Sequence, residues 1–229
     1  MQLAPSALRN LAPRTVNVLW WLSLALAFVP LARLVALGFT GGLGANPLEF
    51  ITHSTGDWTL YFFCITLAVT PLRKITGINW LVKLRRMLGL MAFLYLSLHF
   101  TTFVWFDHFF DLGEIWKDIV KRPFITVGAT ALLLSIPLAA TSTNGMVRRL
   151  GGKRWQLLHR LIYLIVPLGV LHYWWDKAGK NLIAQPLLFA VLVGALLALR
   201  LLWRQTKKGR EKGREQAPAA QGPASVTRS

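Results

Sequence analysis

The chain has 229 residues, of which 54% are hydrophobic and 15% are charged, and its mean hydropathy is +0.47. This composition excludes an ordinary soluble domain and favours a helical protein embedded in a lipid bilayer. The net charge of +17 does not indicate nucleic-acid binding, because the Lys and Arg residues stand in short segments between apolar runs. We therefore expect no nucleic-acid partner.

Six apolar runs approach the length of a membrane-spanning helix. They cover about 16–37, 56–71, 87–106, 124–140, 157–175 and 182–203. Arg9 and Arg14 precede the first run as in a signal peptide, but no clear small-x-small cleavage motif follows, so we expect a retained span. The predicted fold is an all-α bundle of six transmembrane helices over 16–203. A lead over 1–15 and a basic, disordered tail over 204–229 flank it.

The charges of the connecting segments predict the orientation. Most of the 26 Lys and Arg residues lie in the lead, in 72–86, in 141–160 and at the C-terminal end, whereas most acidic residues lie in the other connections. Because positive charge marks the cytoplasmic side, we expect both termini in the cytoplasm. On the outer side, segment 107–122 predicts a short amphipathic helix on the membrane surface.

The glycine-rich segment 38–56 contains GGLGANP, which lacks the GK[ST] ending and the preceding strand of a nucleotide-binding loop. We interpret it as a re-entrant or surface loop, with His53 at the outer end of the second apolar run. The single cysteine, Cys64, has no partner for an internal disulfide and fits a buried apolar position.

His99 and His172 lie at comparable depth in the outer half of the third and fifth runs. Ionisable side chains at membrane depth are costly and usually serve a function. Two imidazoles from different helices suit the two axial positions of a b-type haem iron, and such ligation favours electron transfer. The sequence therefore predicts a haem held by this pair.

His159 lies near the cytoplasmic face, thirteen residues and about 20 Å along a helix from His172. A conventional second haem would need a partner at Arg85 or Arg86, and arginine is a poor ligand because it stays protonated. Two interpretations stay open. His159 binds a second haem with an unusual or absent partner, or it contacts a haem or flavin without ligating iron. In one regular helix, His159 and His172 would also point about 140° apart, unless Pro167 distorts it.

Three further residues have alternative roles. Arg85 and Arg86 either set the topology or hold haem propionates or a flavin phosphate through charge-assisted hydrogen bonds. His53 is either a haem ligand or propionate contact, or a residue of the membrane interface.

Several motifs occur together in one order. They are GGLGANP followed by His53, TPLR at 70–73, RRMLGL at 85–90 leading to His99, TSTN at 141–144, and GKRWQLLHRLIYL at 152–164 followed by LHYWW at 171–175. Over about residues 15–203 the chain resembles the MsrQ family, also called YedZ. These proteins are the haem-binding membrane subunits of a bacterial periplasmic methionine sulfoxide reductase system. More distantly, it resembles the ferric reductase-like transmembrane domain, whose members carry two His pairs on the equivalents of the third and fifth runs. This chain has Arg85 or Arg86 where the cytoplasmic-side His of the third run would be.

The resemblance implies a function. The family takes electrons from the quinone pool or a cytoplasmic flavin reductase, and passes them through haem b to the periplasmic molybdopterin reductase MsrP. That partner catalyses methionine sulfoxide repair. The resemblance also implies FMN as a cofactor and His99, His159 and His172 as haem-linked residues. The alternatives are a stand-alone ferric reductase and a His-dependent transporter, which would need intramembrane carboxylates or inverted repeats.

Overall fold

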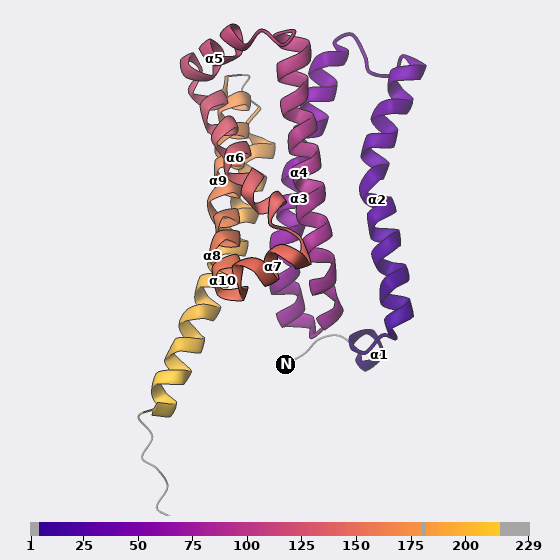
Figure 1. Cartoon of the computed structure of the whole chain (residues 1–229). Helices are drawn as coiled ribbons and strands as arrows, with labels where there is room; N and C mark the ends of the chain where they lie inside the picture. Colours follow the sequence, from indigo (N-terminus) through magenta and orange to yellow (C-terminus); the bar gives the residue numbers. More distant parts are fainter. Residues whose placement is uncertain (1–4, 180–181, 216–229) are drawn as a thin grey trace, which may run out of the picture.

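The computed structural model describes residues 5–179 and 182–215, and every regular element in these ranges is helical (Figure 1). The elements are α1 (Ser6–Arg9), α2 (Pro13–Thr40), α3 (Pro47–Thr76), η1 (Asn79–Lys83), α4 (Leu84–Thr102), η2 (Phe103–Asp107), α5 (Leu112–Lys121), α6 (Pro123–Ala140), α7 (Asn144–Leu150), α8 (Gly152–Leu158), η3 (His159–Leu161), α9 (Ile162–Ala178) and α10 (Ala184–Glu215). The all-α class is as predicted.

Among the described residues, five helical stretches are long and apolar enough to cross a membrane. They are Pro13–Thr40, Asn79–Asp107, Pro123–Ala140, Gly152–Ala178 and Ala184–Thr206. Helix α3, which contains the second apolar run, has 30 residues but is not in this set. It carries charges at both ends, among them Glu49 and Lys74, and it packs along α4 in the middle of the bundle.

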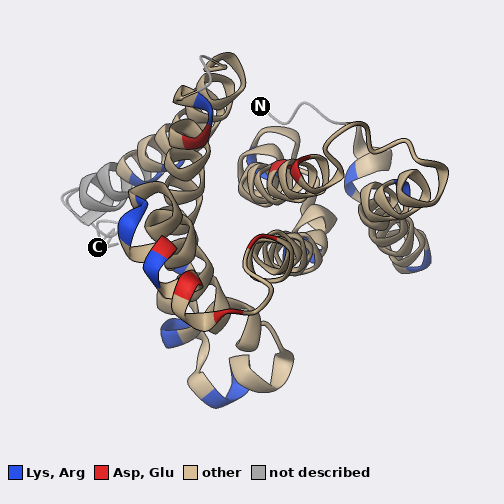
Figure 2. Ribbon diagram, turned by 90° about the horizontal axis from the view of Figure 1, so that it is seen from above, with Lys and Arg blue, Asp and Glu red and all other residues tan. Residues whose placement is uncertain are grey.

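The helices form three groups when the molecule is viewed along their axes (Figure 2). Helix α2 stands to one side, α3 and α4 form the centre, and α6, α9 and α10 lie on the opposite side (Figures 1 and 2). The core lies where α3, α4 and α9 meet. Its fully buried side chains include Leu67, Tyr95, Ile165 and Val166.

Tyr95 joins α2 to this core. Its side chain is fully buried, and its hydroxyl donates to the carbonyl of Ala27 at 2.9 Å and accepts from the amide of Leu31 at 3.1 Å. These two backbone groups would pair with each other in a regular α-helix. Pro30 lies between them inside α2, and a proline there opens the helix. The Tyr95 hydroxyl therefore satisfies backbone groups that the proline turn exposes.

The loop predicted over 38–56 is much shorter in the structure and covers only 41–46. Helix α2 continues to Thr40, and α3 begins at Pro47, where the Asn46 side chain accepts a hydrogen bond from the Glu49 amide. Asn at the cap and Pro at the first helical position are a strong helix start. His53 consequently lies within a helix and has a fixed direction.

Two other segments expected to be irregular contain helices. Residues 141–156 include α7 and most of α8. Helix α10 continues to Glu215, so residues 204–215 are helical where we expected disorder, and the rest of that tail lies outside the described residues. The expected amphipathic helix is present as α5, which lies at the same end of the molecule as the connection between α2 and α3 (Figure 1).

Candidate functional site

His99 of α4 and His172 of α9 meet inside the bundle. Their ring centroids are 6.0 Å apart and their planes are inclined by 76°. Both line a cavity of about 490 Å³ between α3, α4, α6 and α9, and residues of η2 and α5 and His108 also contribute to its wall. The sequence predicted that His99 and His172 lie at the same depth, and in the structure their rings lie next to each other.

The same kind of contact orients each imidazole. His99 Nδ1 donates to the carbonyl of Thr52 at 2.9 Å, and His172 Nδ1 donates to the carbonyl of Phe124 at 2.7 Å. A carbonyl can only accept, so the proton sits on Nδ1 and the lone pair stays on Nε2. Metal-ligating histidines are commonly held in this way by a backbone carbonyl.

Two glycines allow the neighbouring helices to approach these rings. A Cβ on Gly56 of α3 would lie 3.2 Å from the His99 ring, and one on Gly128 of α6 would lie 2.9 Å from His172 Nδ1. Sequence reasoning missed both residues. The available signal was a glycine inside an apolar helix, which often marks close approach of another group.

These residues fit a haem. Metal–imidazole bonds are about 2.0–2.1 Å long, so two imidazoles on opposite sides of one metal place their ring centres roughly 6 Å apart. In the described part of the chain, no three His, Cys, Asp or Glu side chains are grouped to hold a metal ion. A pair of imidazoles facing one cavity therefore suits a group that supplies its own in-plane ligands.

A second cavity of about 490 Å³ lies at the opposite end of the bundle. Arg85, Arg86, Arg160 and Arg204 contribute to its wall, and no Asp or Glu is among the described residues that line it. Arg86 is oriented by a hydrogen bond to the Asn144 side chain at 2.6 Å. This environment suits an anionic ligand, because guanidinium groups bind phosphate and carboxylate well.

His159 lies in this second cavity, away from the His99–His172 pair. Its Nε2 is 3.0 Å from the Thr141 hydroxyl, and its ring stacks on Trp155 with centroids 3.9 Å apart. His159 begins the 3₁₀ turn η3, so the regular helix assumed for the 140° estimate is interrupted there. Pro167, which we considered as the source of distortion, lies within α9.

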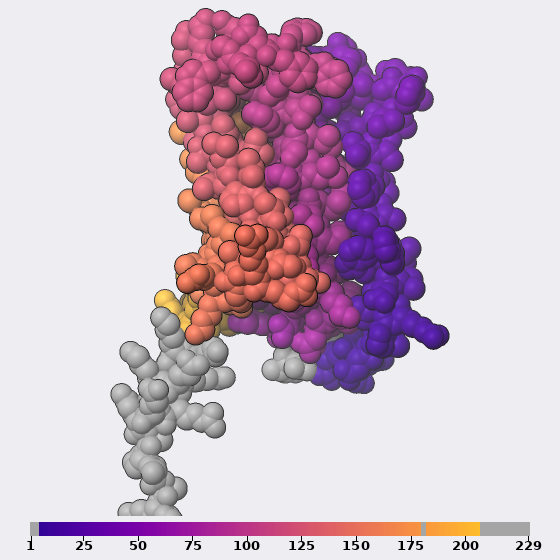
Figure 3. All heavy atoms as spheres, in the orientation of Figure 1, coloured from indigo at the N-terminus to yellow at the C-terminus, as the bar shows by residue number. Residues whose placement is uncertain are grey.

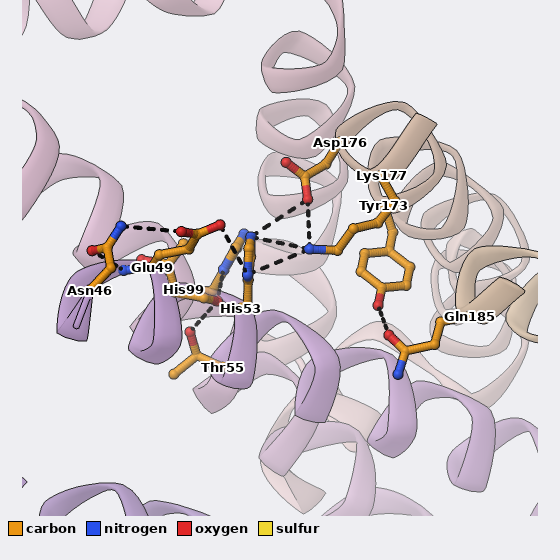
Figure 4. Close-up of polar contacts among 10 residues, drawn as sticks. Asn46, Glu49, His53, Thr55, His99, Tyr173, Asp176, Lys177 and Gln185 are labelled. Carbon is orange, nitrogen blue, oxygen red and sulfur yellow. Dashed lines mark hydrogen bonds and ion pairs between the residues drawn. The ribbon is translucent and has the colours of Figure 1, made fainter. Parts of the chain in front are cut away.

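His53 belongs to a polar cluster rather than to the imidazole pair (Figure 4). Its Nε2 lies 3.2 Å from Lys177 Nζ and 3.6 Å from Asp176, and its Nδ1 lies 3.9 Å from Glu49. Lys177 is only 8% exposed, and sequence reasoning did not single it out. The pairing joins residues 124 positions apart, and no local sequence signal predicts it.

The comparisons with known proteins agree with this geometry. The family model for the ferric reductase-like transmembrane component matches residues 55–170. A protein of Herminiimonas arsenicoxydans is 62% identical over 184 residues, covering 80% of this chain and 84% of its own length. A protein of Ralstonia nicotianae is 56% identical over 207 residues, covering 90% of this chain and 94% of its own length. Both are named haem-binding subunit MsrQ of protein-methionine-sulfoxide reductase.

The chain belongs to the MsrQ family. As a member of a transmembrane family with five apolar helices, it is embedded in the membrane. No solved structure matches it. The segment that matches the family model includes Gly56, His99, Gly128 and His159, and His172 lies two residues beyond it.

Proposed function

We propose that this MsrQ family member binds haem b between His99 and His172 and serves as the electron-transfer subunit of a methionine sulfoxide reductase system. The observation that carries the proposal is the imidazole pair, 6.0 Å apart, with both Nδ1 atoms held by backbone carbonyls. Iron with two imidazole ligands exchanges single electrons and has no open position for oxygen.

The protein's own contribution is to fix the two donor atoms. The Thr52 and Phe124 carbonyls hold each Nε2 free of its proton, and Gly56 and Gly128 leave room for the rings. The names of the relatives support the haem, since they are called haem-binding subunits.

We propose six spans, with α3 as the sixth. Its 30 residues are long enough to cross a bilayer, and Glu49 and Lys74 lie near opposite ends. The protein would then lie in the bacterial inner membrane, with both termini in the cytoplasm. The acidic end, with α5, would face the periplasm and the MsrP-type molybdopterin reductase.

We propose that the arginine-lined cavity holds the phosphate of FMN or the propionates of a second haem, close to His159. The electron donor is the quinol pool or a cytoplasmic flavin reductase. A stand-alone ferric reductase and a histidine-dependent transporter remain the competing functions. The half-buried imidazole pair favours haem over a transporter, because both Nδ1 atoms are committed to backbone carbonyls and do not relay protons.

The test is the reduced-minus-oxidised absorbance spectrum of the purified protein, with a pyridine haemochrome count. His99→Ala and His172→Ala should each abolish the bis-imidazole signal of the outer haem. His108→Ala is the matched control: His108 lines the same cavity, but its ring nitrogen contacts Asp118 at 3.2 Å, so the variant should keep the spectrum. A protein that contains no haem after expression with sufficient haem would overturn the proposal in favour of the transporter.

A further inference from the structure

The two imidazoles are held by one local arrangement that occurs twice in the molecule. His99 of α4 binds a backbone carbonyl of the preceding long helix α3, that of Thr52. His172 of α9 binds a carbonyl of α6, that of Phe124. Both carbonyls lie near the start of their helix, at the end of the molecule where α5 forms the top of the space-filling view (Figure 3).

The correspondence between the two helix pairs extends along the cavity. Every residue of α3 from Thr52 to Leu60 that lines the cavity has a counterpart on α6, 72 positions later, that lines it too. Gly56 and Gly128 are such a pair. The lining residues of 96–103 correspond in the same way to lining residues of α9, 73 positions later. The cavity is therefore built from two equivalent helix pairs, and the differences between paired positions distinguish the two imidazoles.

Thr55 is the difference that lies closest to a carbonyl holding a ring. It is 2% exposed, and its hydroxyl proton lies between the carbonyls of Ile51 at 2.8 Å and Thr52 at 3.0 Å. The counterpart of Thr55 on α6, 72 positions later, is Val127, which has nearly the same shape but no hydroxyl. In the described part of the chain, no side chain other than His172 donates to the Phe124 carbonyl.

The Thr52 carbonyl consequently serves three donors. They are the helical amide of Gly56, the ring of His99 and the hydroxyl of Thr55. A carbonyl oxygen has two lone pairs, so the third donor competes with the imidazole. The distances agree with this competition, because the ring nitrogen lies 2.9 Å from the carbonyl oxygen at His99 and 2.7 Å from it at His172.

The strength of this hydrogen bond controls the other nitrogen of the ring. When Nδ1–H donates strongly, electron density moves to Nε2, and the imidazole becomes a stronger metal ligand. A stronger axial donor stabilises ferric iron relative to ferrous iron, so the reduction potential falls. The buried hydroxyl of Thr55 weakens the bond and therefore acts in the opposite direction.

We infer that Thr55 is a positioning residue that raises the reduction potential of the haem through His99. The inference rests on the proposed function, because it needs haem between His99 and His172. The hydroxyl acts through the Thr52 carbonyl, and the proton stays on Nδ1 in both oxidation states. His172, whose carbonyl has no such competitor, is the stronger of the two axial donors.

The experiment measures the midpoint potential of the purified, haem-loaded protein by spectroelectrochemical titration. Thr55→Val copies the residue at the equivalent position and should lower the potential. The strength of one hydrogen bond corresponds to a change of roughly threefold to tenfold in the reduction equilibrium, and tenfold is about 59 mV for one electron.

The repeated arrangement supplies the reciprocal variant. A threonine in a helix binds the carbonyl three or four residues before it, so Val127→Thr brings a hydroxyl to the carbonyl of Phe124 and should raise the potential. Combining Thr55→Val with Val127→Thr exchanges the two environments and should return the potential close to its original value. Thr66→Val is the matched control, because the Thr66 hydroxyl is also buried on α3 but binds the Phe62 carbonyl. It should leave the potential unchanged.

The haemochrome count separates failure of the inference from failure of the proposed function. Equal potentials in Thr55→Val and the unchanged protein, or shifts of one sign in both single variants, would overturn the inference when the haem content is constant. Absence of haem in every sample would instead contradict the proposed function. The Nδ1 proton of His99, observed by NMR after ¹⁵N-histidine labelling, would then decide: a stronger hydrogen bond moves it downfield in Thr55→Val, and an unmoved signal would refute the inference.

Discussion

At the scale of single residues, Gly128 sets how closely α6 approaches His172. A methyl group there would lie 2.9–3.3 Å from three ring atoms, within the region that real Cβ contacts avoid. In most helices, Gly to Ala stabilises by about 0.5–1 kcal/mol. At this position, the clash with an oriented imidazole opposes that gain.

We therefore predict that Gly128→Ala lowers the haem content severalfold without unfolding the protein. The methyl group turns His172 away from the Phe124 carbonyl and misdirects Nε2. The pyridine haemochrome count per protein checks this result. Gly194→Ala, where no atom lies within 4 Å of the added Cβ, is the control and should bind haem normally.

Tyr95→Phe should detach α2 from the core. The substitution leaves the Ala27 carbonyl and the Leu31 amide without the hydroxyl that satisfies them. An unsatisfied buried polar group costs about 1–3 kcal/mol, so the thermal unfolding midpoint in detergent should fall. Tyr61→Phe, an exposed tyrosine on α3, should leave it unchanged. Equal midpoints for the two variants would show that the hydroxyl contributes nothing to stability.

At the scale of elements, α5 combines a capped start with an exposed apolar stripe. The Asp111 side chain accepts hydrogen bonds from the amides of Gly113 and Glu114, which fixes the first turn. Leu112, Trp116 and Val120 are 61–77% exposed along one face. On the polar face, the Glu114 carboxylate binds Lys117 at 3.0 Å and raises the pKa of that ammonium.

This arrangement decides how to test the proposal that the periplasmic acceptor docks on the acidic end of the molecule, at α5. Charge reversal at Asp111 would also destroy the helix cap, so Glu114→Lys is the cleaner change. It should slow electron transfer to the periplasmic acceptor by roughly tenfold at low salt, with a smaller effect at high salt. Haem content should stay constant. Unchanged transfer at low salt would move the docking surface away from α5.

At the scale of the whole molecule, charge is divided between the two ends. The acidic residues of α3, α5 and α9 gather at one end, and the arginine-lined cavity lies at the other. The single cysteine, Cys64, is buried. A Cys64→Ala background therefore allows one new cysteine at a time to report the topology.

We predict that a membrane-impermeant maleimide labels Ala45→Cys from the outside of intact spheroplasts, and Lys74→Cys only after lysis. Ala45 lies just before α3 and Lys74 lies in its last turn, so opposite accessibility would establish that this helix crosses the membrane. Thr206→Cys should behave like Lys74→Cys, because both termini are expected in the cytoplasm. Labelling of both α3 positions from one side would refute the six-span topology.

The arginine-lined cavity can be tested by its cofactor content. Arg85→Ala combined with Arg86→Ala should lower bound FMN, or the second haem, severalfold, because the anionic group loses its charge-assisted hydrogen bonds. Released flavin fluorescence and the haemochrome count measure the two cofactors separately. Arg148→Ala combined with Arg149→Ala removes equal charge from α7, outside the lining, and should change neither.

The sequence by itself determined the class of the molecule and the depth of its key residues. Apolar run length specifies helices in lipid, and counting residues along them gives positions along the membrane normal. This is why the matched depth of His99 and His172 follows from residue numbers alone. Asn46 and Pro47 also carried a local helix-start signal that our loop assignment overlooked.

Only the tertiary structure decided which groups face one another. The direction of a side chain around a helix depends on local interruptions, and the turn η3 at His159 invalidated an ideal-helix estimate. Contacts between helices depend on packing over the whole bundle. The carbonyls of Thr52 and Phe124, the closeness of Gly56 and Gly128, and the pairing of His53 with Lys177 all arise there. The depth of a residue in the membrane depends only on its position along one helix. A binding site also depends on how several helices are rotated about their axes relative to one another.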